Sequence, residues 1–180
     1  DLNLLTNTLL ELTKLSDDSL PNRFTSIRID DIIWEARSSL LKVHKNYGIS
    51  IEFSENIDSD EQLSILGNGQ LLKVAFMNLI ENGCKFSNNQ TINVNIGFDK
   101  GLFLEFINKG AVIDTKDQKL IFLPFFRSKK TADTRGYGIG LPLAERIIKL
   151  HKGNLFIKES TLDRTVFKVQ FFEEKVIVVN

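Results

Sequence analysis

The chain has 180 residues, which is room for one domain or for one domain with a short appendage. Its 23 Lys and Arg balance 23 Asp and Glu, and this net charge of +0 argues against a dedicated nucleic-acid binder. A hydrophobic content of 42% with 14 Phe excludes disorder over the full length. The single Cys84 excludes an internal disulfide and fits a reducing compartment. No apolar run approaches the roughly 20 residues that span a bilayer.

The N-terminal region predicts a helix followed by a linker. Four leucines recur at a spacing that puts them on one helical stripe, namely Leu2, Leu5, Leu9 and Leu12. The polar stretch from Ser16 to Ser19, before Pro21, predicts the linker. We expect residues 1–20 to be a helix tail with its linker, and residues 21–180 to be the main domain. Because the chain begins at Asp1 without a signal-like segment, we expect an internal piece of a longer protein.

A second helix is predicted from about residue 30, with Asp30 or Asp31 as its N-cap and Gly48 at its end. Its inward stripe consists of Ile33, Ala36, Leu40, Val43 and Tyr47. The alternating residues 49–53 then predict a half-buried strand.

A third helix is predicted from about Gln70 to Phe86, after a Gly67-Asn68-Gly69 turn. Its inner stripe consists of Leu72, Phe76, Leu79 and Gly83. Residues 91–98 alternate strictly, and the turn at 99–101 joins them to an antiparallel partner at 102–107.

The C-terminal third predicts a long loop, a helix and a hairpin. The loop runs from Asn108 to Tyr137, with a short helical turn at 116–122. The helix runs from Gly138 to His151, with Gly153 as its terminator and Ala144, Ile147 and Ile148 facing inward. Strands at 154–159 and 164–172 form the hairpin, and the apolar end of 173–180 has no identifiable partner. Because hairpins outnumber parallel crossovers, we expect a two-layer α/β sandwich in which helices cover one face of a mixed, mostly antiparallel sheet.

Three polar side chains share one face of the third predicted helix. Asn78, Asn82 and Lys85 are spaced at i, i+4 and i+7. An Asn oxygen is a hard ligand suited to Mg²⁺, and a Lys supplies a point charge for phosphate. A solvated helix face would present the same residues, so this pattern alone leaves both interpretations open.

The last long helix opens with a glycine-rich run, Gly136-Tyr137-Gly138-Ile139-Gly140-Leu141. Glycines let the backbone approach a ligand, and a helix N-terminus offers N–H groups to phosphate. A flexible hinge would use the same residues. The run is neither a Walker A loop nor a Rossmann fingerprint, because it lacks GxxxxGK[ST] and no strand leads directly into it.

These segments together resemble the sequence boxes of sensor histidine kinases. Residues 78–87 resemble the N box, residues 122–127 the F box and residues 136–141 the second glycine box, in the order and spacing of that family. The resemblance covers roughly residues 9–172 and implies an ATP-binding domain shared with DNA gyrase, a heat-shock chaperone and a mismatch-repair ATPase. It implies ATP under a mobile lid, residues 128–135. Residues 2–15 look like the tail of the family's dimerisation helix.

The resemblance also implies roles for particular residues. Asn82 corresponds to the Mg²⁺ ligand, Asn78, Lys85 and Arg127 to catalytic residues, and Phe86 to a neighbour of the adenine. The glycines would bring backbone N–H groups to the phosphates. The implied cofactor-binding set is Asn78, Asn82, Lys85, Phe86, Asn108, Gly110, Ile113, Arg127, Gly136, Tyr137, Gly138, Ile139, Gly140 and Leu141.

The first glycine box departs from the family pattern. The family has Asp-x-Gly-x-Gly, whereas this chain has Asn108 in place of the Asp and Val112 in place of the second Gly. An Asn oxygen still accepts a hydrogen bond, so the change weakens the expected contact with adenine without abolishing it.

The chain contains no evident phosphoacceptor histidine. His44 lies in a predicted packed helix, and His151 lies at a helix C-terminus, where an imidazolium suits the dipole. We interpret both as structural and expect the acceptor on a helix outside this chain.

The predicted function is transfer of the ATP γ-phosphoryl group to that His, in a cytoplasmic domain of an inner-membrane parent protein. The expected partners are the phosphoacceptor helix, in the same protein or its dimer mate, and a response regulator receiver domain, with no nucleic acid. One alternative is a nucleotide-binding regulatory module without phosphotransfer, which the altered first glycine box favours. Another is a serine-directed regulator of the anti-sigma type, which the leucine-striped helix disfavours.

Overall fold

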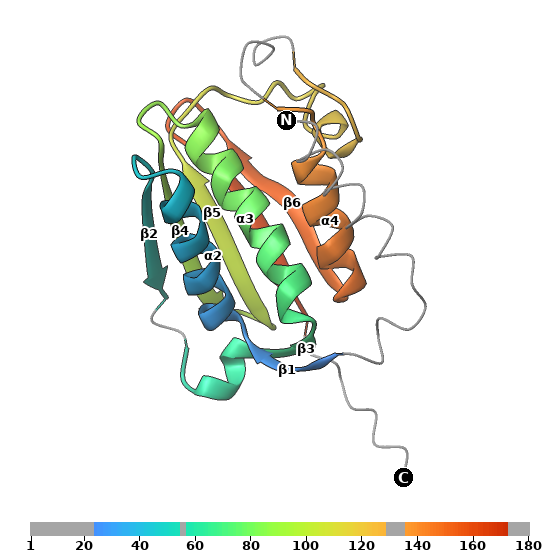
Figure 1. Cartoon of the computed structure of the whole chain (residues 1–180). Coiled ribbons are helices and arrows are strands. Elements are labelled where there is room, and N and C mark those ends of the chain that lie inside the picture. The colour runs from blue at the N-terminus through green and yellow to red at the C-terminus, as the bar shows by residue number, and fades with distance from the viewer. Residues whose placement is uncertain (1–23, 55–56, 129–135, 173–180) are drawn as a thin grey trace.

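The computed structural model describes residues 24–54, 57–128 and 136–172. The elements in chain order are β1 (Thr25–Arg28), α2 (Ile29–Val43), β2 (Gly48–Phe53), η2 (Asp60–Leu63), β3 (Ser64–Gly67), α3 (Gly69–Phe86), β4 (Thr91–Phe98), β5 (Leu102–Asn108), η3 (Leu120–Phe122), α4 (Gly140–Leu150), β6 (Gly153–Ser160) and β7 (Thr165–Phe171) (Figure 1). The helix expected near residues 2–15, its linker and the segment 173–180 lie outside the described residues. No helix among those described is long and apolar enough to cross a membrane.

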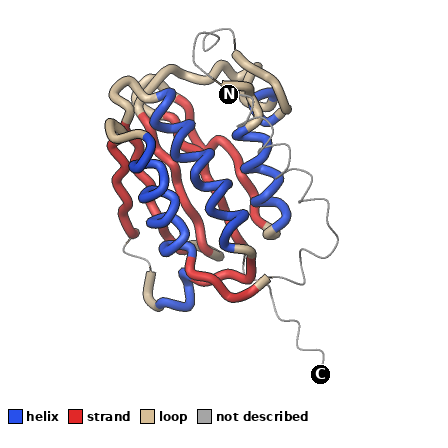
Figure 2. The backbone as a smooth tube through the Cα atoms, in the orientation of Figure 1, coloured by secondary structure: helices blue, strands red, loops and turns tan. Residues whose placement is uncertain are grey.

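Five strands form the main sheet in the order β2-β4-β5-β7-β6. β2 pairs with β4 in parallel, and the other three pairs are antiparallel. α2, α3 and α4 lie over the same face of this sheet (Figure 1 and Figure 2). The predicted two-layer α/β sandwich with a mixed, mostly antiparallel sheet is therefore confirmed.

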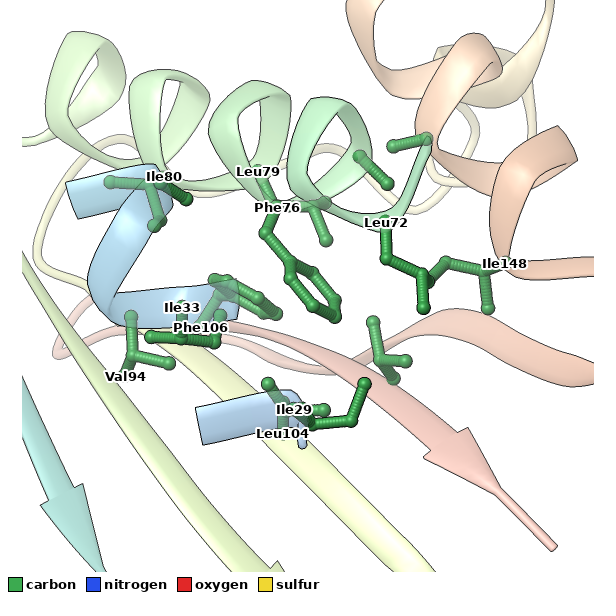
Figure 3. Close-up of a cluster of buried hydrophobic side chains, with 14 of the residues drawn as sticks. Ile29, Ile33, Leu72, Phe76, Leu79, Ile80, Val94, Leu104, Phe106 and Ile148 are labelled. Carbon is green, nitrogen blue, oxygen red and sulfur yellow. The ribbon is translucent and has the colours of Figure 1, made fainter. Parts of the chain in front are cut away.

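The core fills the space between the helices and the sheet. Phe76 of α3 and Phe106 of β5 lie at its centre with their ring centroids 6.2 Å apart (Figure 3). Val94 and Leu104 from the strands and Ile148 from α4 are fully buried around them. Each such side chain contributes roughly 1.5–3 kcal/mol on burial. This core fixes α3 and α4 against the strands that carry the site.

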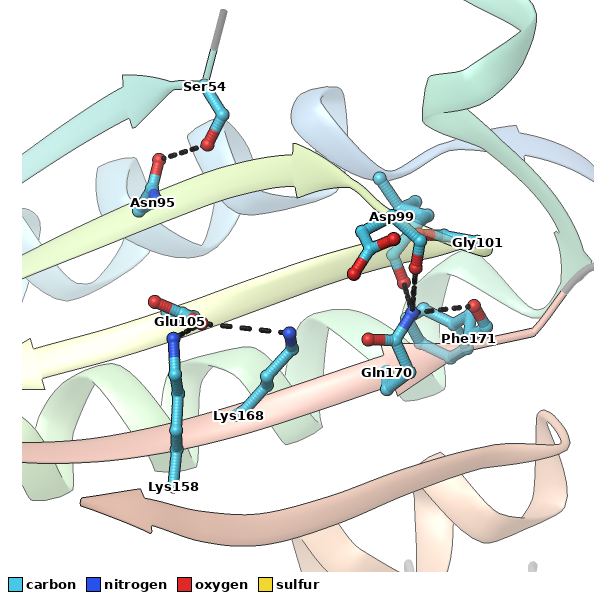
Figure 4. Close-up of polar contacts among 10 residues, drawn as sticks. Ser54, Asn95, Asp99, Gly101, Glu105, Lys158, Lys168, Gln170 and Phe171 are labelled. Carbon is cyan, nitrogen blue, oxygen red and sulfur yellow. Dashed lines mark hydrogen bonds and ion pairs between the residues drawn. The ribbon is translucent and has the colours of Figure 1, made fainter. Parts of the chain in front are cut away.

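The opposite face of the sheet carries paired polar groups (Figure 4). Glu105 is only 8% exposed, and it pairs with Lys158 at 2.6 Å and with Lys168 at 3.7 Å. The Lys168 ammonium also lies 4.1 Å from the centroid of the Phe103 ring. Because a buried carboxylate without a partner is costly, this arrangement allows charged residues on the central strands.

The predicted boundaries of α2 are wrong at both ends. The helix begins at Ile29, and Arg28 rather than Asp30 or Asp31 is the N-cap residue. The Asp30 carboxylate lies in the first turn, where it accepts hydrogen bonds from the Arg28 guanidinium at 2.9 and 3.1 Å. At the other end, Val43 is 76% exposed and Tyr47 lies beyond the helix, so neither extends the inward stripe.

The β1–β3 pair and η2 were not predicted. Residues 25–28 pair with 64–67 in a separate two-stranded antiparallel sheet. Each strand has only four residues, the lower limit for a predicted strand, and neither TSIR nor SILG alternates cleanly between apolar and polar residues. Residues 67–69, predicted as a turn, end β3 and begin α3, with the Asn68 side chain accepting the Leu71 N–H at 3.1 Å.

Candidate functional site

A cavity of about 240 Å³ lies between α3, the loop after β5, the loop around residue 126 and the start of α4. All residues of the predicted cofactor-binding set line it except Gly110, namely Asn78, Asn82, Lys85, Phe86, Asn108, Ile113, Arg127, Gly136, Tyr137, Gly138, Ile139, Gly140 and Leu141. The fold therefore brings the predicted residues of three separate segments, 78–86, 108–113 and 127–141, to one cavity.

The polar face of α3 turns toward this cavity. Asn78 donates its Nδ2 hydrogen to the Val74 carbonyl oxygen at 2.9 Å, which fixes the orientation of its amide. The Lys85 ammonium lies 3.2 Å from the Glu81 carboxylate, one turn earlier, and both groups are about one-third exposed. Asn82 lines the cavity beside them. The face is thus a cavity wall and not a fully solvated helix surface.

A turn at Gly138 directs the N-terminus of α4 at the cavity. Gly138 has φ +69°, and its carbonyl oxygen accepts the Phe125 N–H at 2.9 Å. A Cβ there would lie 2.6 Å from the Phe126 carbonyl oxygen, so only glycine fits. This conformation also explains why the helix begins at Gly140 and not at the predicted Gly138.

The N-terminus of α4 is an electrostatically favourable place for an anion. No side chain caps the helix, and the backbone N–H groups of Gly140 and Leu141 have no intrahelical acceptor. Pro142, the next residue, has no N–H to satisfy. The positive end of the helix dipole and two N–H groups without an intrahelical acceptor therefore lie at the cavity that Lys85 also lines.

The end of β5 forms the opposite part of the cavity. Asn108 is 6% exposed and lines the cavity. Gly110 instead lies under the end of α3, where an added Cβ would overlap the Phe86 carbonyl oxygen. A bridge between Ser87 and Gly110, together with an Asn88 N–H to Lys109 carbonyl bond of 2.8 Å, holds the two segments together.

Several cavity residues lie outside the predicted set, namely Glu81, Ala111, Val112, Ile121, Phe126, Ser128, Pro142, Thr165 and Phe167. The position of Glu81 four residues before Lys85 could have indicated an ion pair. Thr165 and Phe167 lie on β7, opposite Asn108 and Phe106 of β5. Only knowledge of that strand register would have placed them here.

The described residues contain no group of three or more His, Cys, Asp and Glu side chains that could hold a metal ion. A divalent cation in this cavity would therefore have few protein ligands. The donor set fits Mg²⁺, which usually keeps several waters and takes its other ligands from a phosphate. Among the side chains that line the cavity, Asn82 has an amide oxygen of the hard type that Mg²⁺ prefers. The predicted lid falls largely on residues 129–135, outside the described part of the chain.

Neither histidine lines the cavity. His44 caps the end of α2 and stacks on Tyr47 with ring centroids 4.5 Å apart. His151 is buried, and its Nε2 accepts the Asn68 N–H at 3.0 Å while its Nδ1 lies 2.7 Å from the Ile147 carbonyl oxygen. The proton therefore sits on Nδ1, and the ring is neutral rather than the cation suited to the helix dipole. Burial also lowers the pKa of His151, against the two backbone hydrogen bonds, which raise it.

This histidine should make the stability of the domain fall as the pH drops below about 6.5, the usual His pKa. Because the folded-state pKa is lowered, the unfolded chain takes up a proton first as the pH falls. The free energy of unfolding should decrease by at most about 1.4 kcal/mol per pH unit from this group. Urea denaturation between pH 7.5 and 5.5 measures this decrease. Glu159 does not titrate in this pH range, because its hydrogen bond with Arg164 lowers its pKa from the ordinary value of 4.5.

The control for this measurement is the His151→Gln variant, which should flatten the pH dependence. His44→Gln, at the partly exposed stacked ring, should leave it largely unchanged. Equal slopes in the parent and in His151→Gln would contradict the assignment.

The sequence of the cavity region matches a known protein family. Residues 67–175 match the family described as histidine kinase-, DNA gyrase B-, and HSP90-like ATPases. This span contains all the residues that line the cavity.

Curated relatives of the chain are a sensor protein and two kinases of sensory and signal-transduction systems. The chain is 31% identical over 167 residues to the heme sensor protein HssS of Staphylococcus haemolyticus, covering 92% of this chain and 35% of that protein. It is 32% identical over 162 residues to the adaptive-response sensory-kinase SasA of Prochlorococcus marinus, covering 87% and 42%. The signal transduction histidine-protein kinase ArlS of Staphylococcus aureus is 30% identical over 167 residues, covering 91% and 36%. The chain thus spans less than half the length of these relatives.

Solved structures of histidine kinases share the fold. The nucleotide-free catalytic domain of histidine kinase ThkA aligns with a TM-score of 0.67 and 22% identity, covering 82% of this chain and 94% of that one. Full-length ShkA in complex with AMPPNP aligns with a TM-score of 0.71 and 17% identity, covering 93% and 35%. With a family match over more than half of its residues, the chain belongs to the histidine kinase-, DNA gyrase B-, and HSP90-like ATPases.

Proposed function

We propose that this domain binds ATP with Mg²⁺ and transfers the γ-phosphoryl group to a histidine outside residues 1–180. The observation that carries the proposal is the convergence of Asn82 and Lys85 with the uncapped N-terminus of α4 in one cavity. Phosphoryl transfer is catalysed mostly by positioning and by stabilisation of charge, and these groups supply both. ShkA, a structural neighbour, was crystallised with AMPPNP, which supports a nucleotide as the ligand.

Different residues of the cavity bind the metal, the phosphates and the adenine of the nucleotide. The Asn82 amide oxygen would hold Mg²⁺, and the metal would supply charge that neutralises the phosphates. Lys85 and Arg127 contact the phosphates, and the Gly136–Leu141 turn supplies backbone N–H groups. Phe86, Ile113 and Asn108, which line the same cavity, surround the adenine.

Asn78 favours transfer over hydrolysis. An amide cannot take a proton from water, so the position offers no general base. One of its two Nδ2 hydrogens is donated to the Val74 carbonyl oxygen, and its side-chain oxygen lies against Gly140, 2.5 Å from where a Cβ on that residue would be. ATP held in this way persists until an acceptor histidine arrives.

The acceptor and the downstream partner follow from the sensor kinases to which the chain is similar. The acceptor is a helix of the same protein or of its dimer mate, and a response regulator receiver domain takes the phosphoryl group next. In this proposal the domain lies in the cytoplasm and belongs to an inner-membrane protein. The rival function is a nucleotide-binding regulatory module without phosphotransfer, favoured by Asn108 and Val112 in the first glycine box.

Two measurements on the 180-residue chain test the proposal. Calorimetric titration should show ATP binding that strengthens when Mg²⁺ is added. Incubation with γ-labelled ATP should give no acid-labile label until a segment carrying the phosphoacceptor helix is supplied. Label on His44 or His151 of the chain alone would contradict the structural roles of those residues. Binding of ATP without label on any supplied acceptor would favour the regulatory module.

A further inference from the structure

A chain of hydrogen bonds lies behind the wall of the cavity, away from the α3 face. The Ile113 N–H donates to the Ser160 hydroxyl oxygen at 3.0 Å, and that oxygen lies 3.1 Å from the Thr165 hydroxyl oxygen. Ile113 and Thr165 line the cavity, whereas Ser160 does not. Ser160 therefore does not line the cavity itself but contacts two residues that do.

The fold holds Ser160 at the junction of three segments. It is the last residue of β6 and pairs with Thr165, the first residue of β7. Thr165 in turn pairs with Asn108 at the end of β5. The 160–165 connection is closed by a bond of 2.9 Å from the Thr161 N–H to the Arg164 carbonyl oxygen. Ser160 thus links the β6–β7 hairpin to the loop that contains the altered first glycine box.

The hydrogen bond between Ser160 and Thr165 determines which group the Thr165 hydroxyl offers to the cavity. The Ser160 oxygen already accepts the Ile113 N–H and has one hydrogen of its own. If Ser160 donates that hydrogen to Thr165, the Thr165 hydrogen remains available to the cavity. If Thr165 donates instead, it offers the cavity only an acceptor. In both cases Ser160 restricts what Thr165, which is 3% exposed, can present to a base.

We infer that Ser160 is a positioning residue for the base of the bound nucleotide, acting through the Thr165 hydroxyl and the Ile113 loop. The inference rests on the proposed ATP binding. Without Ser160, the Ile113 N–H loses its acceptor and the Thr165 hydroxyl can rotate. Both effects weaken the fit of the base and the distinction between adenine and guanine.

The test is calorimetric binding of ATP and GTP to single and double variants. Ser160→Ala should weaken ATP binding about fivefold to tenfold, the effect of one hydrogen bond, and should narrow the ratio of ATP to GTP affinity. Ser160→Thr keeps the hydroxyl and should restore both quantities. In a Thr165→Val background, Ser160→Ala should lose most of its effect on that ratio, because interacting residues are not additive. Thr161→Ala, in the exposed connection next to Ser160, is the matched control and should bind as the parent does.

Two results would overturn the inference. One is parent-like affinity and selectivity in Ser160→Ala, and the other is an undiminished Ser160→Ala effect on selectivity in the Thr165→Val background. If Ser160→Ala does not fold, Ser160→Cys, with its weaker donor and acceptor, replaces it with the same expected direction. If the parent chain binds no ATP, the proposed function fails and this inference fails with it. ATP binding by the parent with unchanged variants overturns this inference alone.

Discussion

Replacing Asn82 with Ala should abolish the Mg²⁺ dependence of ATP binding. Mg²⁺ usually takes few protein ligands, and the carboxylate nearest to Asn82 on the cavity wall, Glu81, is already paired with Lys85 at 3.2 Å. Asn82 lines the cavity together with Lys85 and with Gly140 and Leu141, the first residues of α4. Removing it leaves the ammonium and the backbone N–H groups, which attract phosphate without metal. Residual binding should therefore persist, while phosphotransfer to a supplied acceptor should fall to background.

Calorimetric titration with ATP at saturating Mg²⁺ and with a chelator measures this dependence. Asn82→Asp, which keeps a hard oxygen ligand, should retain a response to Mg²⁺. Asn154→Ala removes an exposed amide from β6, away from the cavity, and should change nothing. A parent-like response to Mg²⁺ in Asn82→Ala would show that the metal ligand lies elsewhere.

The long elements could be predicted because burial imposes a period on the sequence. The predicted helix from Gln70 to Phe86 is α3 to within one residue, and its stripe of Leu72, Phe76 and Leu79 is buried. β4 has the predicted bounds, and its partner β5 extends one residue beyond them. The boundaries of α2 could not be predicted in this way. They depend on local contacts such as the ion pair between Arg28 and Asp30, and such contacts produce no periodic pattern in the sequence.

The candidate site was predictable where its residues lie in one continuous segment. The residues of α3 and of the glycine-rich turn carry recognisable patterns, and all those predicted there line the cavity. Thr165 and Phe167 belong to no recognisable sequence pattern. They line the cavity because β7 pairs with β5, which places them opposite Asn108 and Phe106. For Gly110 the pattern indicates a ligand contact, and the structure adds a second reason for a glycine, a close contact with the backbone at the end of α3. A sequence motif does not distinguish these two reasons for a glycine.

Replacing Gly110 with Ala should destabilise the whole domain. The added Cβ would overlap the Phe86 carbonyl oxygen, which belongs to the backbone at the end of α3 and cannot rotate away. The Ser87–Gly110 bridge and the Asn88–Lys109 hydrogen bond oppose any separation of the two segments. Overpacking of this kind costs about 1–3 kcal/mol when side chains can move, so we expect about 3 kcal/mol or more here. Relief of the clash would also displace Ala111 to Ile113 from the cavity wall.

Urea denaturation of the Gly110→Ala variant measures this loss, and Gly69→Ala is the matched control. Gly69 begins α3, and a Cβ there would meet only the flexible end of Ile32, at 3.0 Å. Because Ala favours a helix over Gly by about 1 kcal/mol, this control should be neutral or stabilising. The free energy of unfolding of Gly110→Ala could instead lie within about 1 kcal/mol of that of the parent, which is the effect of a typical substitution. In that case the backbone at the end of α3 yields to the added Cβ, and the contact is not tight. The first glycine box would then serve the ligand directly, and Gly110→Ala should weaken ATP binding without loss of stability. Measuring both quantities on the same variant separates a backbone contact that supports the cavity from a contact with the nucleotide itself.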